Sequence, residues 1–270
     1  MVFDSVDIKK EFEILGFFSA LKFQWNNGYF YSGESHNFWE AVYVDSGEVQ
    51  VTEDGRVYRL KSGELIFHAP MEFHSIKSEK EVPTNVLIFS FHINGELPKN
   101  LAKGVFYLSA DEQTEFKTIF DLIYNFYKKN TDCYSGIECE SKLNSFIIHL
   151  NRNHSVEKPL NLSQSAQQYN NIILFMKEKI YDNISLNEIA KEKNISVSYI
   201  KFLFTVYSGT TPKVYYSKLR CNEVIKLLSK GLSPTEISHL MNFSSPYYFS
   251  NYFKKQTGMS PKKYLQNIKF

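Results

Sequence analysis

Two short stretches in the C-terminal third of the chain carry polar and basic side chains at helical spacing. They are Ser198, Lys201, Phe202 and Thr205, and then Tyr247, Ser250, Asn251 and Lys254. Steps of three and four residues place each set on one face of a helix. Hydroxyl, amide and basic side chains can hydrogen-bond to base edges in the major groove of DNA. Either set alone could be an ordinary exposed helix face, but two such faces together favour the reading of DNA.

Further basic residues lie close to these faces. Lys254 and Lys255 end the second stretch, and Arg220 lies between the two stretches. Basic side chains of this kind pair with phosphate, which fixes the register of a protein on the duplex without reading its sequence. We therefore add Lys255 and Arg220 to the candidate DNA contacts.

Both stretches belong to an internal repeat. Residues 185–215 and 233–264 share Ser, Glu, Ile, Asn and Ser at an offset of 48 positions, and then Tyr, Phe, Gly, Pro, Lys and Tyr at an offset of 49. A segment this short cannot form a domain alone, so it is a supersecondary unit used twice. The pattern of the unit is typical of helix-turn-helix, and we place the two units at about 185–209 and 233–258.

Local signals mark the ends of the helices in each unit. Ser185 with Glu188, and Ser233 with Glu236, form the spacing of a capping box. Asn194 and Asn242 recur where the chain must turn, and asparagine tolerates positive φ. Gly209 and Gly258 can end the second helices. Residues 212–230 are predicted to form one long helix that joins the two units.

The C-terminal segments resemble the DNA-binding domain of AraC-type transcription regulators over residues 169–268. The resemblance is carried by SLNEIAKEKNISVSYIKFLF, TTPKVYYSKLR and SPTEISHLMNFSSPYYFSNYFKKQTGMSPKKYL. It implies an all-α domain of seven helices in which two helix-turn-helix units are joined by a long helix, and the second helix of each unit reads DNA. The family often has basic residues near Phe202 and Thr205, whereas here only Lys201 is charged. We therefore expect the second unit to hold DNA more strongly than the first.

Charge divides the chain into two halves. Residues 1–160 carry 16 Lys and Arg against 23 Asp and Glu, a balance of −7, and residues 161–270 carry 15 against 6, a balance of +9. The net charge of +2 conceals this difference. A basic half favours a polyanionic partner, and double-stranded DNA fits the repeat.

The acidic half has the pattern of a β-structure. Short runs rich in β-branched and aromatic residues at 42–44, 48–52, 56–60, 64–67 and 86–93 are separated by turn residues. Closely spaced strands of this kind predict a sandwich or barrel. The run FWEAVYVDSGEVQVTEDGRVYRLKSGELIFHAPMEFHSI resembles the cupin barrel of AraC-type sensor domains. The fold class expected is α+β with two domains, a cupin-like β-barrel with a helical pair and an all-α domain.

The expected barrel could hold a small organic effector, because such sites combine apolar walls with a few polar groups. The candidate effector-binding residues are Trp25, Tyr29, Phe38, Tyr43, His74 and His92. For each of them, ordinary packing in the core is the competing interpretation. A sugar, an aromatic acid or a fatty acid would all fit the sequence.

A metal-dependent cupin enzyme with a DNA-binding appendage is the alternative function. Its candidate ligands are His36, Glu40, His68, His74 and His92. Enzymatic cupins generally carry His-x-His with a following Glu and a later His, but His36 lacks the paired histidine. We therefore expect no metal, no cofactor and no catalytic residue. A repeat that serves protein–protein contacts only is a third hypothesis.

The domain boundaries follow from these patterns. We expect a sensor barrel at 1–110, a helical pair at 111–151, a polar linker at 152–168 and the DNA-binding domain at 169–270. The resemblance implies that the helical pair makes a homodimer contact, although packing on the barrel would explain its apolar stripes equally well. RNA polymerase is a further candidate partner. The longest apolar runs fall short of the ~20 residues of a membrane helix, and the odd cysteine count suits a reduced, cytoplasmic setting.

Overall fold

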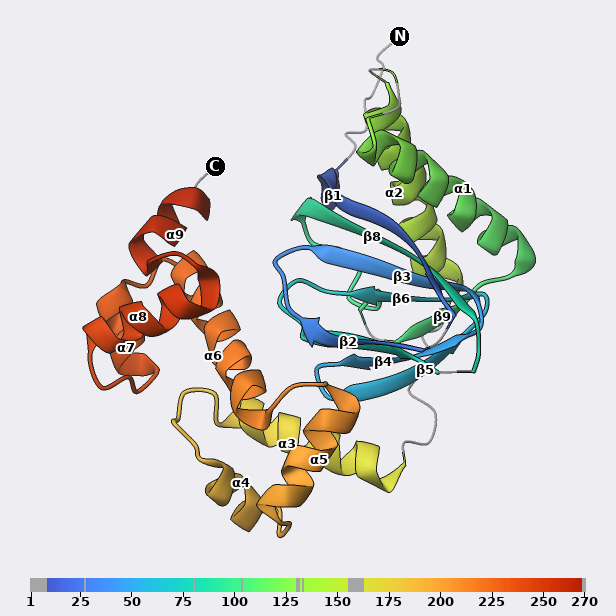
Figure 1. The fold of residues 1–270 in the computed structure, drawn as a ribbon. Coiled ribbons are helices and arrows are strands. Elements are labelled where there is room, and N and C mark those ends of the chain that lie inside the picture. The colour runs from blue at the N-terminus through green and yellow to red at the C-terminus, as the bar shows by residue number, and fades with distance from the viewer. Residues whose placement is uncertain are drawn as a thin grey trace.

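Nine strands and nine helices form the part of the chain that the structure, a computed structural model, describes: residues 9–26, 28–79, 81–102, 104–129, 132, 134–154 and 163–268. The strands come first and the helices follow (Figure 1). The strands are β1 (Phe12–Trp25), β2 (Tyr29–Glu34), β3 (Trp39–Ser46), β4 (Glu48–Glu53), β5 (Arg56–Lys61), β6 (Glu64–His68), β7 (His74–Ser78), β8 (Thr84–Gly95) and β9 (Val105–Tyr107). The helices are α1 (Ala110–Tyr127), α2 (Ser135–Asn153), α3 (Gln164–Glu178), α4 (Leu186–Glu192), α5 (Val197–Tyr207), α6 (Pro212–Ser229), α7 (Pro234–Leu240), α8 (Pro246–Thr257) and α9 (Pro261–Ile268).

The strands form two antiparallel sheets, which we call the β-domain. One sheet has the order β1-β8-β3-β6-β9 and the other has the order β2-β7-β4-β5. Between the sheets lies an apolar core that includes Val42, Val44, Val51, Leu60 and Ile66. These turn-separated strands confirm the β-rich N-terminal domain expected from the sequence. The segments 12–25, 29–34, 74–78 and 105–107, which were not predicted, complete the two sheets.

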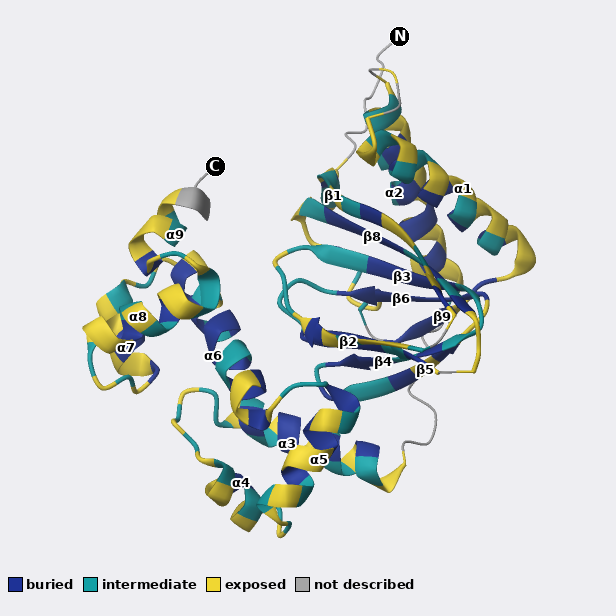
Figure 2. Cartoon of the chain, in the orientation of Figure 1, coloured by how far each residue is buried: buried dark blue, intermediate teal, exposed yellow. Residues whose placement is uncertain are grey.

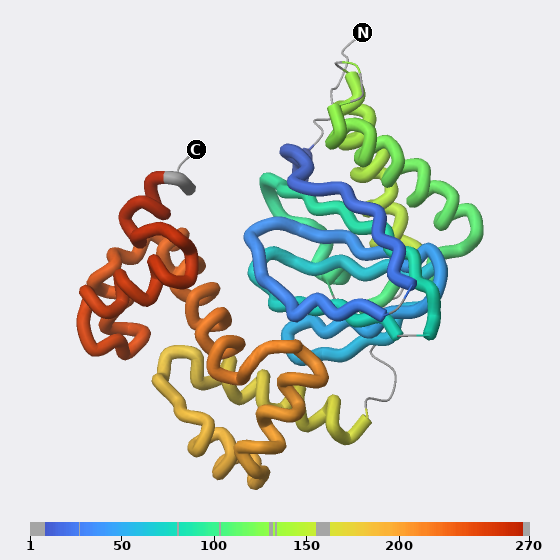
Figure 3. Tube along the Cα trace, in the orientation of Figure 1, coloured from blue at the N-terminus to red at the C-terminus, as the bar shows by residue number. Residues whose placement is uncertain are grey.

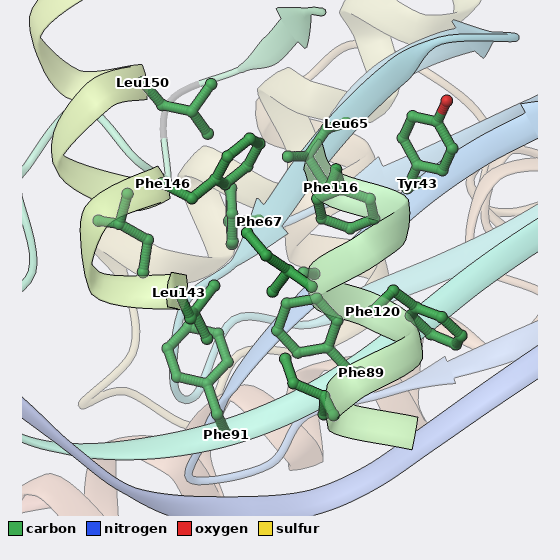
Figure 4. Close-up of a cluster of buried hydrophobic side chains, with 14 of the residues drawn as sticks. Tyr43, Leu65, Phe67, Phe89, Phe91, Phe116, Phe120, Leu143, Phe146 and Leu150 are labelled. Carbon is green, nitrogen blue, oxygen red and sulfur yellow. The ribbon is translucent and has the colours of Figure 1, made fainter. Parts of the chain in front are cut away.

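Helices α1 and α2 cover the outer face of the larger sheet. Aromatic side chains of both layers meet there, and Figure 4 shows Phe67, Phe89 and Phe91 of the sheet among Phe116, Phe120 and Phe146 of the helices. Each helix is buried on the side that faces the sheet and exposed on the other (Figure 2). The helical pair predicted at 111–151 therefore packs on its own β-domain.

Helices α3 to α9 form the C-terminal helical domain, and its core is divided in two. One cluster, which includes Tyr169, Ile173, Ile200, Leu203 and Phe204, holds the first helix-turn-helix unit, α4 and α5. A separate cluster, which includes Val224, Ile237, Met241, Phe249 and Phe253, holds the second unit, α7 and α8. The long helix α6 passes from one cluster to the other (Figure 3). This arrangement confirms the expected all-α domain.

The turn and cap signals of the repeat are present in both units. The hydroxyls of Ser185 and Ser233 each accept a hydrogen bond from the third backbone N–H of the helix. The glutamate carboxylate at that third position accepts a hydrogen bond from the backbone N–H of the serine. Asn194 and Asn242 have φ of +52° and +53°, the left-handed region that the turn requires. Gly209 and Gly258, with φ of +62° and +76°, follow the second helices. Because these signals are local, the sequence revealed them directly.

Helices overlap both ends of the predicted linker at 152–168. Helix α2 continues to Asn153, and α3 begins at Gln164 behind Ser163, whose hydroxyl accepts from the backbone N–H of Ala166. Residues 155–162 of the predicted linker lie outside the described residues. Among the helices that the structure does describe, none is long and apolar enough to cross a membrane.

The two domains pack against each other through the smaller sheet. Phe73, in the turn before β7, is 1% exposed and belongs to the apolar cluster of the first unit, with its ring centroid 4.5 Å from that of Tyr215. Lys177 of α3 forms an ion pair with Asp54 at 2.7 Å. A β-carbon on Gly209 would meet the Phe30 ring of β2 at 2.5 Å. The first unit is therefore docked on the β-domain.

The second unit lies apart from the strands. Its apolar cluster contains no strand residue among those that the structure describes. In Figure 1, α7, α8 and α9 lie beyond α6, on the side away from the sheets. A β-carbon on Gly258, the counterpart of Gly209, would meet nothing within 4 Å. The two copies of the repeat therefore have different surroundings.

Candidate nucleic-acid interface and sensor cavity

Helix α5 presents its predicted reading face to solvent. Its buried side is formed by Ile200, Leu203, Phe204 and Tyr207. Ser198, Lys201, Phe202 and Thr205 are all exposed, and Phe202 is 55% exposed although it is aromatic. The Thr205 hydroxyl donates to the carbonyl oxygen of Lys201 at 3.0 Å, so its own proton is already used within the helix. This face offers few hydrogen-bond donors and a large apolar surface.

Helix α8 presents a more polar face. Phe249 and Phe253 point into the second cluster, while Tyr247, Asn251, Lys254 and Lys255 are exposed and Ser250 is half-buried. Tyr247 is 78% exposed, the highest value among the large hydrophobic side chains that are described. Serine caps begin both helices, at Ser196 and Ser245. The structure thus brings the residues predicted for the second reader onto one open face.

A groove of about 920 Å³ runs between the two units beside α6. Asn251 and Lys255 of α8 and Lys213 of α6 are among the residues that line it. Tyr248, which is exposed, also lines this groove. Lys213 and Tyr248 were not among the candidates, because the sequence does not show which side chains of α6 and α8 face the space between the two units.

Arg220, a predicted DNA contact, is buried in the structure, which argues against a contact with phosphate. Its guanidinium donates to the carbonyl oxygen of Met241 at the end of α7 and to Asn183 Oδ1, and it lies 4.8 Å from the Phe243 ring centroid. Arg220 is only 6% exposed. It holds the turn of the second unit and, although it is among the residues that line the groove, exposes little of its side chain.

A cavity of about 220 Å³ lies between the two sheets of the β-domain. Trp25, Tyr29 and His74, three of the six predicted effector residues, line it. The rings of Trp25 and Tyr29 are stacked, with centroids 4.5 Å apart and planes 13° apart. Glu34, Glu40, His68 and His74 form its polar part, and Val42, Ile76 and Ile88 are among its apolar walls.

The other three predicted effector residues do not line this cavity. Tyr43 points to the opposite side of β3, where its hydroxyl donates to Gln113 at 3.3 Å, because neighbouring residues of a strand face opposite sides. Phe38 stacks between His36 and Phe18 in the segment before β3. His92 lies on β8 against Phe18 and Gly16. These three side chains belong to the packing of the β-domain.

Four ionisable side chains meet beside the cavity, and three of them, Glu34, Glu40 and His74, line it. One ligand atom from each of Glu34, His36, Glu40 and His74 lies within 4.8 Å of the other three. Glu40 is central, with Oε1 at 3.3 Å from His74 Nε2 and Oε2 at 3.7 Å from His36 Nε2. Two strands, one strand end and one connecting segment supply the cluster. The expected His-x-His pattern requires a second histidine two positions from His36. Glu34 occupies such a position, and it was not considered because it is not a histidine.

The charges in this cluster are strongly coupled. Burial alone would raise the pKa of Glu40, but the neighbouring His36 and His74 rings lower its pKa well below the ordinary value. Burial would lower the pKa of His74, whereas Glu40 raises it above the ordinary value. His68, stacked on His74 with centroids 4.3 Å apart, is fully buried, and burial lowers its pKa to about 3. The site therefore favours a carboxylate at Glu40 and positive charge beside it.

Residues next to this cluster contact the helical domain. Ser75, which lines the cavity, donates its hydroxyl proton to the carbonyl oxygen of Tyr207 in α5 at 3.0 Å. Lys218 of α6 donates to the carbonyl oxygen of Gly33 at 3.1 Å, and Ser35 donates to Asn222 Oδ1 at 3.3 Å. The chain positions on both sides of Glu34 are therefore held by α6.

Comparisons with known proteins agree with the two-part architecture. A family model described as an AraC-like ligand binding domain matches residues 20–147, and one described as a helix-turn-helix domain matches residues 189–267. The MmsAB operon regulatory protein of Pseudomonas aeruginosa is 23% identical over 247 residues, which is 88% of this chain and 78% of that protein. The HTH-type transcriptional activator RhaR of Yersinia pestis is 21% identical over 245 residues, which is 87% of this chain and 84% of that protein.

Among solved structures, ToxT from Vibrio cholerae is 14% identical, with a TM-score of 0.38 over 95% of this chain and 98% of that one. The DNA-binding domain of AdpA, solved in complex with a target DNA, is 20% identical, with a TM-score of 0.35 over 37% of this chain and 90% of that one.

Proposed function

Because this chain belongs to the AraC-type transcription regulators, which join a ligand-binding domain to a helix-turn-helix DNA-binding domain, we propose that α5 and α8 read a specific DNA sequence. The observation that carries the assignment is that both helices bury the same apolar positions and leave their predicted reading faces open. Two readers joined by one helix suit successive major grooves, which recur about every 34 Å.

The two readers have different roles in this proposal. Helix α8 anchors the protein, since Asn251 can form a bidentate pair with adenine, and Lys254 and Lys255 can contact phosphate. Helix α5 contributes Lys201 as a charge and offers Phe202 to thymine methyl groups. The different polarity of the two exposed faces supports this division.

The effector binds in the cavity of the β-domain. Its volume of about 220 Å³ is below the ~300–1,000 Å³ of typical ligand pockets, so the effector is small. The stacked Trp25 and Tyr29 offer a flat apolar wall, and His74 offers a polar contact. Glu34 and Glu40 repel an anionic ligand unless a cation lies between them, which favours a neutral or cationic small molecule.

The effector acts on DNA binding through the first unit. Ser75 of β7 lines the cavity and also hydrogen-bonds to Tyr207, the last residue of α5. A shift of β7 on effector binding would therefore be transmitted directly to this reading helix. The exposed residues of α5 are not covered by the β-domain in the docked arrangement. Control therefore works by repositioning the first reader relative to the second, and not by masking it.

The helical pair provides a homodimer contact in this proposal. On the side of α2 away from the sheet, Ile137 is 63% exposed, and Tyr134 just before it is 71% exposed. Pairing of two copies along this side would bury both residues. The dimer would bring two copies of the DNA-binding domain to one promoter, where RNA polymerase is the further partner. The chain acts as a regulator and not as an enzyme.

Fluorescence anisotropy with the DNA upstream of the protein's own gene tests the assignment. Asn251→Ala should lose roughly 1–3 kcal/mol of discrimination at one base pair, because an amide pair with a base carries sequence information. Lys254→Ala should weaken binding to all sequences and reduce the dependence of log K on log salt by about 1. His239→Ala, on the exposed side of α7, is the matched control.

The same titrations separate the alternatives. Equal losses on specific and random DNA for Asn251→Ala would contradict base reading by α8. Binding that does not change with salt would contradict the phosphate contacts and favour a repeat that serves protein contacts.

A further inference from the structure

The cluster of Glu34, His36, Glu40 and His74 brings several hydrogen-bond acceptors together, and Ser90 Oγ donates to one of them, Glu40 Oε2, at 3.2 Å. His36 Nδ1 lies 3.0 Å from the carbonyl oxygen of Phe38, and His74 Nδ1 lies 3.2 Å from the carbonyl oxygen of Glu72. A carbonyl oxygen only accepts, so Nδ1 carries the proton in each ring. In the neutral rings, both Nε2 atoms are then acceptors, and both face the Glu40 carboxylate, which is also an acceptor.

Burial makes this arrangement costly unless something positive lies between the acceptors. The side chains of His36, Glu40 and His74 are 10%, 13% and 6% exposed. His36 Nε2 is buried and has no hydrogen-bond partner. A proton on His74 would relieve the contact at 3.3 Å. It would not supply a partner for His36 Nε2, which lies 3.7 Å from the other carboxylate oxygen.

We propose that this cluster binds one divalent transition-metal ion through Glu34, the Nε2 atoms of His36 and His74, and Glu40. A histidine that ligates a metal typically donates its other ring N–H to a carbonyl or carboxylate, which fixes the tautomer. Phe38 and Glu72 supply those carbonyl groups for the two rings. The proposal concerns a binding site and assigns no reaction to it.

The distances and the donor types fit such an ion. Bonds of about 2.0–2.2 Å place ligand atoms about 3.3–4.4 Å apart around one centre. The present limit of 4.8 Å requires side-chain shifts of only a few tenths of an ångström. Two imidazoles with two carboxylates suit zinc, iron or manganese better than the oxygen-only sets of calcium or magnesium.

The position of the cluster links the ion to the helical domain. Glu34 and His36 flank Ser35, which donates to Asn222, and Gly33 accepts from Lys218. An ion that fixes Glu34 and His36 therefore orders the segment that holds α6, the helix between the two readers. This second step rests on the proposed function, because it needs α5 and α8 to bind DNA.

Cobalt(II) is the probe for the site, because its visible absorption reports the coordination of the ion. The full-length protein is freed of metal with a chelator and titrated with Co²⁺, and zinc is then used to displace it. We expect one ion per chain. Loss of a hydrogen-bond partner behind a ligand weakens metal binding by about 10–100-fold, so Glu34→Gln and His74→Ala should raise the Kd at least about 100-fold.

His149→Ala is the matched control, since His149 lies on α2 outside the cluster. It should bind Co²⁺ like the unaltered chain. Circular dichroism and melting of each metal-free variant check that it is folded. No binding by the unaltered chain would overturn the proposal and leave a protonated His74–Glu40 pair. Equal binding by all variants would overturn it too, because the ion would then lie elsewhere.

The link to DNA is tested separately. The DNA affinity of the metal-free protein is measured first, and this titration tests the proposed function alone. Added Zn²⁺ should then change that affinity by at least about fivefold, the lower end of typical coupling between two sites. The change should disappear in His74→Ala. Tight metal binding with unchanged DNA affinity would overturn the coupling and leave the metal site intact.

Discussion

Phe73→Ala should separate the two domains without unfolding either one. Phe73 comes from the β-domain, but its ring is buried in the apolar cluster of the first helix-turn-helix unit. Truncation of a buried phenylalanine costs about 3–5 kcal/mol. Lys218 Nζ lies 5.0 Å from the ring centroid, and loss of this cation–π contact adds about 0.5–1 kcal/mol. Most of this cost falls on docking, because the Phe73 ring packs across the boundary between the two domains.

A loss of about 3 kcal/mol lowers the ratio of docked to undocked molecules by about two orders of magnitude. Small-angle X-ray scattering should therefore show a larger radius of gyration for Phe73→Ala, and calorimetry should resolve two melting transitions. The DNA affinity should change little, since α8 is not part of this interface. The response of DNA binding to an effector or a metal ion should be lost.

Phe18→Ala is the control for this experiment. Phe18 is also a β-domain phenylalanine, but it is 47% exposed and stacks on Phe38 away from the helical domain. It should leave the radius of gyration unchanged. If Phe73→Ala behaved in the same way, with one transition and an unaltered radius, the docking role of Phe73 would be refuted.

Three further predictions concern buried groups. Arg220→Ala should destabilise the second unit by about 1.5–3 kcal/mol, the usual range for hydrogen bonds to a charged group, and salt titrations of DNA binding should keep their slope, since Arg220 is buried. Burial alone would raise the pKa of Glu112, but hydrogen bonds from His154, Ser109 and His149 outweigh it and lower the pKa from 4.5 to about 2. The ionised Glu112 carboxylate therefore stabilises the fold above about pH 4.5, and this stabilisation is lost as the pH falls towards 2. Between pH 4.5 and 2, the urea midpoint of Glu112→Gln should therefore decrease less than that of the unaltered chain. Burial raises the pKa of the Cys221 thiol to about 12, so a thiol reagent should label it only at the rate at which the native protein opens, and rapid labelling of the folded chain would contradict this.

The sequence predicted the helical domain well because its signals are local. A capping box, an asparagine turn and a glycine each act within a few residues, and the repeat displayed all of them twice. The long helix α6 was predicted at 212–230 and ends at Ser229. Burial of Arg220 was not predictable in this way, since the carbonyl of Met241 reaches it only once two helices have packed.

The cavity was harder to predict because its central strands are covered on both sides. Residues 41–44 of β3 are all buried, so hydropathy does not alternate and cannot show which side chains face the space between the sheets. Tyr43 was assigned to the cavity for this reason, whereas Val42 lines it. Glu34 was not among the candidates because the expected pattern was a histidine pair, whereas carboxylate oxygens can also bind a metal ion.

Gly209 and Gly258 occupy equivalent positions in the two copies of the repeat, so the effect of a substitution at one can be compared with the same substitution at the other. Both have left-handed backbone angles, so alanine at either position carries the same local strain, about 1 kcal/mol. Only Gly209 has a neighbouring ring, that of Phe30. The difference in stability between the two alanine variants therefore measures steric contact between domains inside a single molecule. It also follows that the duplicated positions are under unequal constraint, since position 258 can vary at a cost in local conformation alone, while position 209 must remain without a side chain for as long as the first unit rests on β2.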